Sequence, residues 1–533
     1  MTSHKKGNLI FLLILVGYAI YAGVYIFKTS FTAGGERYFV LFDDAMISMR
    51  YARNLAAGHG LVWNPGGERI EGYTNPLWVI FMAFFHLFPI PASKMSLFVQ
   101  VSGAAFLMAN LIFVKKIART LSGSWLVALL AVILTAFYTP LNNWGLQGME
   151  VSALALITSV AVWIALTSLA LNRFTPWIYV LLGISTLVRI DMAVPYLILM
   201  GFLTLADPPN RRHHLLWGLG TLAFFLLGQT LFRLAYYGEV LPNTYYLKME
   251  GYPLFSRIAR GLYVLFRFIW SFNWLLFLLP FAVLFFRRDR AVVLAILVIL
   301  GQLAYSVYVG GDAWEHRGGA NRYISIVMPL FFVLFVYAAD LLRAAILNRL
   351  QAGTRSAQVI SLAGLVTFVL AGMLNMNLLQ DFRSLERWAL VRQPLFIEGN
   401  KEYVQIALAL KKITRPQASV AVVSAGAIPY FSELSAIDLL GKNDARIAHS
   451  QAHGAGNIFD LENFRPGHMK WDYDYSLGQL QPDVVVQLWG DTETAEAYLE
   501  RDYVVGGAAG DMAFSLRKES PDILWDRVVL VPE

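Results

Sequence analysis

Two adjacent carboxylates, Asp43 and Asp44, begin a segment whose apolar residues recur with a helical period. Ile47, Tyr51 and Leu55 stand four residues apart, a spacing typical of a helix that lies along an apolar interface. In one interpretation a carboxylate is the helix N-cap and accepts hydrogen bonds from free backbone N–H groups. In the other it acts as a general base, because a carboxylate near an apolar surface can have a raised pKa. The two interpretations are compatible, since adjacent side chains point in different directions.

The loop continues through residues 58–76 with several Gly and Pro residues, which favour turns. Aromatic, amide and acidic side chains of the types that contact sugars stand between them. The candidate substrate-binding residues of this region are Arg50, Trp63, Asn64, Glu71, Tyr73, Thr74 and Asn75. The alternative is an ordered surface loop whose Trp belongs to an interfacial aromatic belt.

Cations that could hold a phosphate occur at two further places. Arg189 stands between two short apolar stretches, and its planar guanidinium fits phosphate oxygens. An ion pair between Arg189 and Asp191 that stabilises a helix break is an equally good interpretation. Lys248 is a second phosphate candidate, with a snorkelling interfacial lysine as the alternative. Asn243 and Tyr245, in the same short motif, are candidate substrate contacts.

A third group of ionisable residues is confined to one short loop. Asp312, His316 and Arg322 lie within eleven positions of one another. Two potential ligands at this spacing are a weak metal signal, so we assign no metal site and expect substrate or phosphate contacts there. Glu150 and Gln147 could contact a sugar, although capping of the following helix is the favoured interpretation.

The composition places these groups in a membrane protein. Of the 533 residues, 57% are hydrophobic and 15% are charged, and the apolar residues come in long blocks. A single soluble core cannot absorb them, which excludes a soluble enzyme, a disordered chain and a disulfide scaffold. The net charge of +7 is weak support for nucleic acid binding, because Lys and Arg collect on the cytoplasmic side of membrane proteins. We therefore expect no nucleic acid partner, and zero Cys excludes disulfides and thiolate metal sites.

About eleven segments are apolar enough to be transmembrane helices. The predicted spans are Leu9–Phe27, Met95–Val114, Trp125–Phe137, Val151–Leu171, Trp177–Leu187, Met192–Leu205, Leu215–Leu234, Leu262–Phe286, Ala291–Val309, Tyr323–Leu347 and Val359–Met376. The basic clusters all fall on one side if residues 76–88 form an interfacial or re-entrant helix. This predicts a cytoplasmic N-terminus, an uncleaved first span and an outer tail.

The predicted topology puts most ionisable candidates at the outer face. The middles of the spans are almost free of charge, which argues against the continuous polar path of a transporter. The chain carries no phosphate-binding loop and no dinucleotide fingerprint, so ATP-driven transport is not expected. A site at the outer interface is the better interpretation.

Beyond residue 376 the hydrophobic blocks stop. Strand-like runs at Ser419–Ser424, Asp483–Leu488 and Tyr503–Gly506 alternate with helical stretches at Lys401–Lys412 and Glu493–Glu500. We predict a membrane domain over residues 1–376, with the first outer loop at 28–75, and an extracytoplasmic α/β domain over residues 377–533.

Several motifs together resemble one enzyme family. They are Phe42-Asp43-Asp44, Gly58-His59-Gly60-Leu61-Val62-Trp63-Asn64, Glu71-Gly72-Tyr73-Thr74-Asn75, Pro242-Asn243-Thr244-Tyr245-Tyr246-Leu247-Lys248, Gly310-Gly311-Asp312 with Arg322-Tyr323, Ala425-Gly426-Ala427-Ile428-Pro429-Tyr430, Asp438-Leu439-Leu440-Gly441, Asn443-Asp444 and Ile447-Ala448-His449. As a set they resemble the GT-C superfamily of polyprenyl-phosphate-sugar glycosyltransferases. Within it they are most similar to the terminal β-(1→2)-arabinofuranosyltransferase family.

The resemblance implies a polytopic α-helical GT-C fold in the bacterial inner membrane. It implies a lipid-linked donor, a decaprenyl- or undecaprenyl-phosphate sugar, with D-arabinofuranose as the sugar. The acceptor would be an envelope polysaccharide or protein, and the outer tail would help to shape its groove. The catalytic acid would be Asp43 or Asp44, and Arg189, Lys248 and Arg322 would neutralise the donor phosphate.

Three matters stay open at this level. The Asp would be a base if the reaction inverts, and a nucleophile or charge stabiliser if it retains. No cofactor is required, and a divalent metal has no support from the residues. The competing functions are a flippase or transporter of lipid-linked saccharide and a GT-C transferase of another sugar such as mannose.

Overall fold

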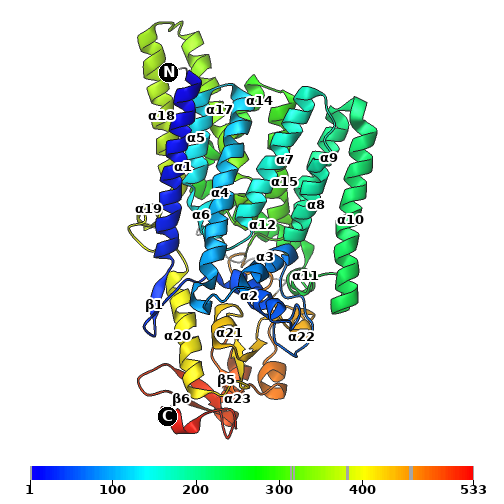
Figure 1. Cartoon of the computed structure of the whole chain (residues 1–533), viewed down its shortest axis with the longest axis vertical. Coiled ribbons are helices and arrows are strands. Elements are labelled where there is room, and N and C mark those ends of the chain that lie inside the picture. Colours follow the sequence, from blue (N-terminus) through cyan, green and yellow to red (C-terminus); the bar gives the residue numbers. More distant parts are fainter. Residues whose placement is uncertain (1–2, 313–314, 316–318, 380–382, 455–459, 532–533) are drawn as a thin grey trace. The chain divides into compact units, whose positions relative to one another are not determined.

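The computed structural model describes residues 3–312, 315, 319–379, 383–454 and 460–531 (Figure 1). The chain forms two compact units built from interleaved segments. The helical unit comprises Met1–Lys28, Gln100–Gly228 and Ile258–Pro394, and the mixed unit comprises Thr29–Val99, Gln229–Arg257 and Leu395–Glu533. The mixed unit thus groups the predicted outer loop 28–75 with the tail, and the boundary at residue 376 stays a prediction.

Seven helices in the described part of the chain are long and apolar enough to cross a membrane. They are α1 (Ser3–Lys28), α4 (Ala92–Ser122), α7 (Val151–Leu171), α10 (Arg211–Tyr237), α15 (Arg290–Tyr308), α17 (Met328–Arg349) and α18 (Arg355–Asn377). Two bent pairs raise the number of candidate spans to nine. Two further predicted spans correspond to the shorter apolar helices α8 (Trp177–Val188) and Ile190–Ala206, the latter made of η1 and α9.

One bent pair follows a predicted span and the other breaks one. α5 (Trp125–Ala136) and α6 (Thr139–Leu146) meet at 54°, and α12 (Leu254–Phe272) meets the segment Trp274–Phe286 at 104°. The second bend falls at Asn273, whose φ of 74° ends α12 and whose side chain accepts a hydrogen bond from Leu275 N–H. The straight span predicted over Leu262–Phe286 is therefore a sharply broken one.

A second boundary also differs from the prediction. The expected span Tyr323–Leu347 contains a break between α16 (Arg322–Ser325) and α17. Pro329 occupies the first turn of α17. A proline lacks the N–H needed within a helix and disfavours helical backbone in the residue before it. The polar residues Arg322 and Tyr323 therefore lie outside the long helix.

The core of the helical unit is α17. Its residues 328–339 are buried on every side, as expected for a helix that is apolar all round. It packs against α5, α15 and the turn η3 (Leu279–Ala282).

The mixed unit contains a six-stranded sheet with the order β4-β3-β5-β7-β6-β8. Its strands are β3 (Ser419–Val422), β4 (Ser435–Asp438), β5 (Val484–Val485), β6 (Tyr503–Gly507), β7 (Ala513–Arg517) and β8 (Val529–Leu530). The runs predicted as strands contain β3, β5 and β6, and the predicted tail helices lie within α20 (Ile397–Ile413) and α23 (Glu493–Asp502). β3 pairs in parallel with β4 and with β5, and the remaining pairs are antiparallel.

Parallel pairing brings the loops after β3, β4 and β5 to one edge of the sheet. Gln487, after β5, ties this edge together because its side-chain oxygen accepts hydrogen bonds from Val423 N–H at 3.1 Å and Ser424 N–H at 2.8 Å. In parallel sheets ligands bind outside the carboxyl ends of the strands. The helix α2 (Asp43–Ala56), from the first loop, packs against α21 (Ala427–Ser432), the short helix that follows β3.

Candidate functional site

Asp43 is the first residue of α2 and contacts the loop that follows β3. Its Oδ1 lies 2.8 Å from Ala427 N and its Oδ2 lies 3.3 Å from Gly426 N. A Cβ at position 426 would overlap the Asp43 carbonyl oxygen, so the close approach requires glycine. Phe42 occupies the N-cap position of α2 and caps it with no side-chain hydrogen bond. The N-cap interpretation is therefore wrong for α2. The side chain of Asp43 instead accepts hydrogen bonds from backbone N–H groups of a loop far away in the sequence.

Asp44 pairs with a lysine from the neighbouring loop. The Nζ of Lys442, just after β4, lies 2.5 Å from Asp44 Oδ1, and each side chain is only 16% exposed. Gly441 precedes Lys442 with a φ of +77°, a conformation that favours glycine. The loops after two adjacent parallel strands thus hold the two neighbouring carboxylates, and we call Asp43, Asp44, Lys442 and the Gly426–Ala427 amides the carboxylate cluster.

The environment of Asp43 changes its acidity. The pKa of Asp43 is raised from 3.8 to about 6, mainly by burial and in part by the negative charge of Asp44. The Ala427 N–H, the Lys442 charge and the Gly426 N–H oppose this rise. A carboxylate with a pKa of about 6 is well suited to accept a proton near neutral pH.

Arg50 is positioned on the buried side of α2. It is 1% exposed and donates to Trp63 O at 2.6 Å, to Pro429 O at 2.5 Å, to Asn64 Oδ1 at 2.7 Å and to Leu434 O at 2.8 Å. Asn64 in turn donates to Ala436 O at 2.8 Å. These bonds join α2, the first loop and the tail. These four bonds give Arg50 a structural role, and its predicted role in substrate binding stays a prediction.

Glu71 belongs to a buried ion pair that the sequence did not predict. Its Oε2 lies 2.7 Å from Nε of Arg233, near the end of α10, and the two side chains are 4% and 3% exposed. The pKa of Glu71 is raised to about 7, because the effect of burial exceeds the opposing effect of the Arg233 charge and hydrogen bond. An Arg within an apolar segment is itself a signal of function or pairing, and this signal could have identified Arg233.

The other predicted contacts of the first loop surround this pair. The Tyr73 hydroxyl lies 2.8 Å from the Tyr237 hydroxyl, and Asn75 Oδ1 accepts from the Ser48 hydroxyl at 2.9 Å. Both Tyr73 and Asn75 are buried, whereas Thr74 is half-buried. Glu71, Tyr73 and Asn75 therefore stabilise the loop that carries Thr74.

The motif at α11 (Asn243–Met249) supports the loop after β4. The Asn243 amide donates to Gly441 O at 2.9 Å and to Lys442 O at 3.0 Å, which fixes the backbone of the lysine that faces Asp44. Tyr245 is 42% exposed, and the methylene groups of Lys248 pack against Gly467. Asn243 thus supports the carboxylate cluster, and Tyr245 stays a candidate for substrate contact.

In the helical unit the predicted cations Arg189 and Arg322 lie together. Arg189 donates to Glu150 Oε1 and to Asp191 Oδ1, each at 2.8 Å. Arg322 donates to Asp312 Oδ1 at 2.8 Å. Both guanidinium groups lie over the ring of Tyr323, at 5.0 Å and 5.7 Å from its centroid. We call these residues the arginine cluster.

The arginine cluster contains its own acids, three carboxylates for two guanidinium groups. The predicted alternative, an ion pair between Arg189 and Asp191, is present, and Glu150 is a second partner of Arg189 rather than a cap. Asp312 is likewise the partner of Arg322. His316 lies outside the described residues. Over the described ranges, no three His, Asp or Glu side chains are grouped to hold a metal ion.

The candidates thus form two clusters, one in each compact unit. The sequence named Asp43, Asp44 and the two arginines, but it did not assign partners to the carboxylates. Lys442 and the Gly426–Ala427 amides follow the parallel strands β4 and β3, whose order the sequence did not predict.

Solved structures with this architecture define the class of fold. ArnT from Cupriavidus metallidurans bound to undecaprenyl phosphate aligns over 96% of this chain and 98% of its own, with a TM-score of 0.58 and 13% identity. The archaeal oligosaccharyltransferase AglB from Archaeoglobus fulgidus, in complex with an inhibitory peptide and a dolichol-phosphate, aligns over 98% of this chain and 75% of its own, with a TM-score of 0.54 and 12% identity. The fold is the GT-C fold of membrane glycosyltransferases, as predicted.

Sequence comparison adds a particular relative. The chain is 26% identical over 359 residues to a terminal β-(1→2)-arabinofuranosyltransferase of Corynebacterium glutamicum. The match covers 59% of this chain and 49% of the relative, so the chain spans about half the length of the curated relative it matches. Residues 392–518 match a family described as a domain of unknown function, DUF8728.

Proposed function

We propose that this protein is a polyprenyl-phosphate-dependent glycosyltransferase of the bacterial inner membrane. Its donor is polyprenyl-phosphate D-arabinofuranose, and its acceptor is a cell-envelope glycan or glycoprotein. The reaction takes place at the outer face, with the N-terminus in the cytoplasm and the tail outside. The likeness to an arabinofuranosyltransferase and the GT-C fold support the class of reaction.

The carboxylate cluster is the observation that carries this proposal. Asp43 has a pKa of about 6 and is fixed by two backbone amides, while Asp44 beside it is neutralised by Lys442. Asp43 is thus oriented by backbone amides and, within the described part of the chain, has no cation as a hydrogen-bond partner, whereas Asp44 is paired with Lys442. We assign the reacting role to Asp43 and a positioning role to Asp44 and Lys442.

Transfer requires one bond to break and one to form. The bond between the anomeric carbon and the phosphate oxygen breaks, and the polyprenyl phosphate leaves with an additional negative charge. The acceptor oxygen bonds to the anomeric carbon, and if the reaction inverts, its proton passes to Asp43. A fixed cation stabilises the charge that develops on the phosphate, and Arg189, Arg322 and Lys248 are the candidates for that task.

For either arginine this role requires an exchange of partners. Arg189 and Arg322 are paired with carboxylates, so a phosphate would compete with Glu150, Asp191 or Asp312 for the same N–H donors. The phosphodiester of the donor carries one negative charge, like a carboxylate, and its oxygens fit the same planar guanidinium. The departing polyprenyl phosphate carries more charge than a carboxylate, so the exchange is favoured as the bond breaks.

The test is sugar transfer by the purified full-length chain in proteoliposomes. Polyprenyl-phosphate arabinofuranose and polyprenyl-phosphate mannose are supplied separately, with an arabinan oligosaccharide as the acceptor. We expect transfer of arabinofuranose, and a loss of at least about a hundredfold in Asp43→Asn, the usual range for removal of a positioned acid or base. The anomeric configuration of the product assigns the chemistry of Asp43: inversion identifies a base, and retention identifies a nucleophile or charge stabiliser.

A matched control is Asp526→Asn, which removes an exposed tail carboxylate whose neighbour is Arg527 at 3.9 Å. This variant should keep wild-type turnover. Wild-type turnover in Asp43→Asn would overturn the assignment of Asp43. Movement of labelled lipid-linked sugar across the bilayer without transfer would overturn the proposed enzyme in favour of a flippase.

A further inference from the structure

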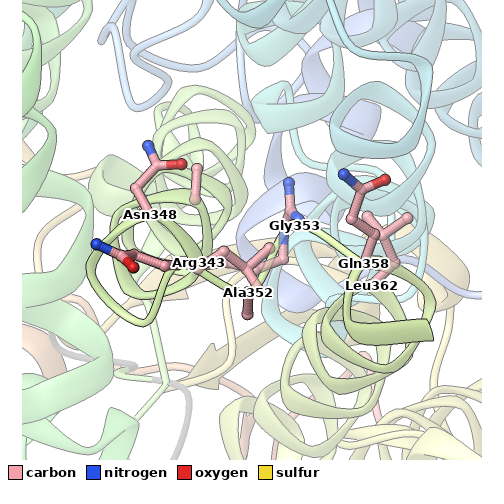
Figure 2. A pocket seen from close by; sticks show the side chains of 9 residues that line it. Arg343, Asn348, Ala352, Gly353, Gln358 and Leu362 are labelled. Atoms are coloured by element: carbon pink, nitrogen blue, oxygen red, sulfur yellow. The ribbon is translucent and has the colours of Figure 1, made fainter. Parts of the chain in front are cut away.

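A cavity lies at the end of the hairpin formed by α17 and α18, within the helical unit. Its volume is about 540 Å³. Figure 2 shows the side chains that line it, drawn from the last turns of α17, the connecting loop and the first turns of α18. The lining residues are Arg343, Ala344, Leu347, Asn348, Gln351, Ala352, Gly353, Gln358 and Leu362. None of the proposed catalytic residues belongs to this hairpin.

The lining of the cavity combines apolar and polar side chains and carries one positive charge. Three amide side chains, Asn348, Gln351 and Gln358, offer both donors and acceptors. Arg343 supplies the charge, and no Asp or Glu is among the lining residues that the structure describes. A negatively charged group that also carries hydroxyl groups would match this lining.

Arg343 has donors left for such a group. Its Nε and Nη2 lie 2.8 and 2.7 Å from Asp340 Oδ1, and its Nη1 lies 3.3 Å from the Ser361 hydroxyl. A guanidinium has five N–H donors, so one N–H remains on each Nη nitrogen. Two neighbouring N–H groups form the fork that matches two oxygens of a phosphate.

The surface around the cavity is apolar in one part and basic in another. Ile346, Leu350, Val359 and Ile360 are 57%, 69%, 59% and 71% exposed. The same hairpin carries Arg349 and Arg355, so the basic residues outnumber its one acid, Asp340. Acyl chains fit the apolar surface, and an anionic headgroup fits the basic end.

We propose that this cavity binds the headgroup of an anionic phospholipid, with the phosphodiester on Arg343 and the headgroup hydroxyls on the three amides. The acyl chains lie along the exposed apolar residues of α17 and α18. The hairpin is thus a lipid-binding site that is separate from the carboxylate and arginine clusters.

The test uses the full-length protein in detergent with added lipid. Native mass spectrometry measures binding of phosphatidylglycerol and of phosphatidylcholine, which share acyl chains and differ in net charge. We expect phosphatidylglycerol to bind about tenfold more tightly, a difference of about 1.4 kcal/mol. Both lipids carry the phosphodiester, but only phosphatidylglycerol offers hydroxyl groups to the amides and lacks the choline cation that Arg343 repels. Arg343→Gln should abolish this preference.

Two further variants separate charge from volume. Ala352→Phe keeps every charge but fills the cavity, and should also abolish the preference for phosphatidylglycerol. Arg288 is an exposed arginine that does not belong to the hairpin, and its guanidinium donates to Leu284 O. Arg288→Gln should leave the preference for phosphatidylglycerol intact. Equal binding of the two lipids by the wild type, or an equal loss in Arg288→Gln, would overturn the proposal. Thermal stabilisation by inorganic phosphate as large as that by phosphatidylglycerol would also overturn it, since the site would then be one for free phosphate.

Discussion

Replacement of Lys442 tests the reasoning about the carboxylate cluster directly. The Nζ of Lys442 lies 2.5 Å from Asp44 Oδ1 and its charge also lowers the pKa of Asp43. Lys442→Met keeps an unbranched side chain and removes the charge. The pKa of Asp43, about 6 in the wild type, should therefore rise.

The magnitude follows from the range of the interaction. A single opposite charge within about 4–6 Å changes a carboxyl pKa by about 1 unit or more. If Asp43 must be ionised to react, the acidic limb of the pH–activity profile should move from about 6 to about 7 or above. Activity at pH 6 should fall about fivefold relative to the wild type, because the ionised fraction drops from about one half at a pKa of about 6 to about one tenth at a pKa of about 7, and it should recover by about pH 8.5.

The assay is initial-rate sugar transfer in proteoliposomes from pH 5 to 9. Lys442→Arg, which keeps the positive charge, is the matched control and should retain the wild-type limb. The pair is only partly exposed, so Lys442→Met should also lower the free energy of unfolding by about 1–2 kcal/mol, between the values for surface and fully buried pairs. An unchanged acidic limb, or an equal loss at every pH, would show that Lys442 does not tune the reacting carboxylate.

Three other outcomes are expected. Asp43→Asn should be more stable than the wild type by about 1–2 kcal/mol above pH 6 and equal to it below pH 4. The pKa of Asp43 is raised on folding, so its carboxylate lowers the free energy of unfolding as pH rises from 3.8 to about 6. Thermal denaturation at both pH values measures this difference, and a gap of the same size at pH 4 would contradict the prediction. Gly426→Ala should reduce transfer by at least about tenfold, since the new Cβ overlaps the Asp43 backbone, whereas Gly399→Ala, whose Cβ would stand 3.9 Å from Tyr403, should keep full activity. Arg189→Ala leaves two buried carboxylates without their cation and should lower stability by about 3–5 kcal/mol, and a thermal midpoint in detergent equal to that of the wild type would refute this.

The sequence predicted those features that depend on local pattern. Long apolar blocks located the membrane helices, and Val-rich runs located β3 and β5, because burial of apolar side chains dictates both. The strand β4 was missed, since Ser435–Asp438 has four residues and only two of them are apolar. The bend at Asn273 was missed because one residue with positive φ leaves no mark on the hydropathy of the surrounding helix.

In the candidate site, too, the sequence predicted what depends on local pattern and missed what depends on distant residues. Asp43 and Asp44 were visible because two adjacent carboxylates in an apolar chain are rare and costly. Their partners were not, because Lys442 is 398 residues from Asp44 and the Ala427 amide is 384 residues from Asp43. The capping interpretation failed for the same reason: it considered only the helix to which Asp43 belongs. The partners could only be found once the parallel order of β4, β3 and β5 was known.

The distance along the sequence between Asp43 and its amide donors has a consequence for the synthesis of the protein. Asp43 leaves the ribosome early, whereas Gly426, Ala427 and Lys442 are translated almost four hundred codons later. During that interval the first loop has neither the two amides nor the cation that hold its carboxylates. If Asp43 reacts as proposed, a nascent chain interrupted before β3 would lack these partners and would be inactive until the tail is made and folded.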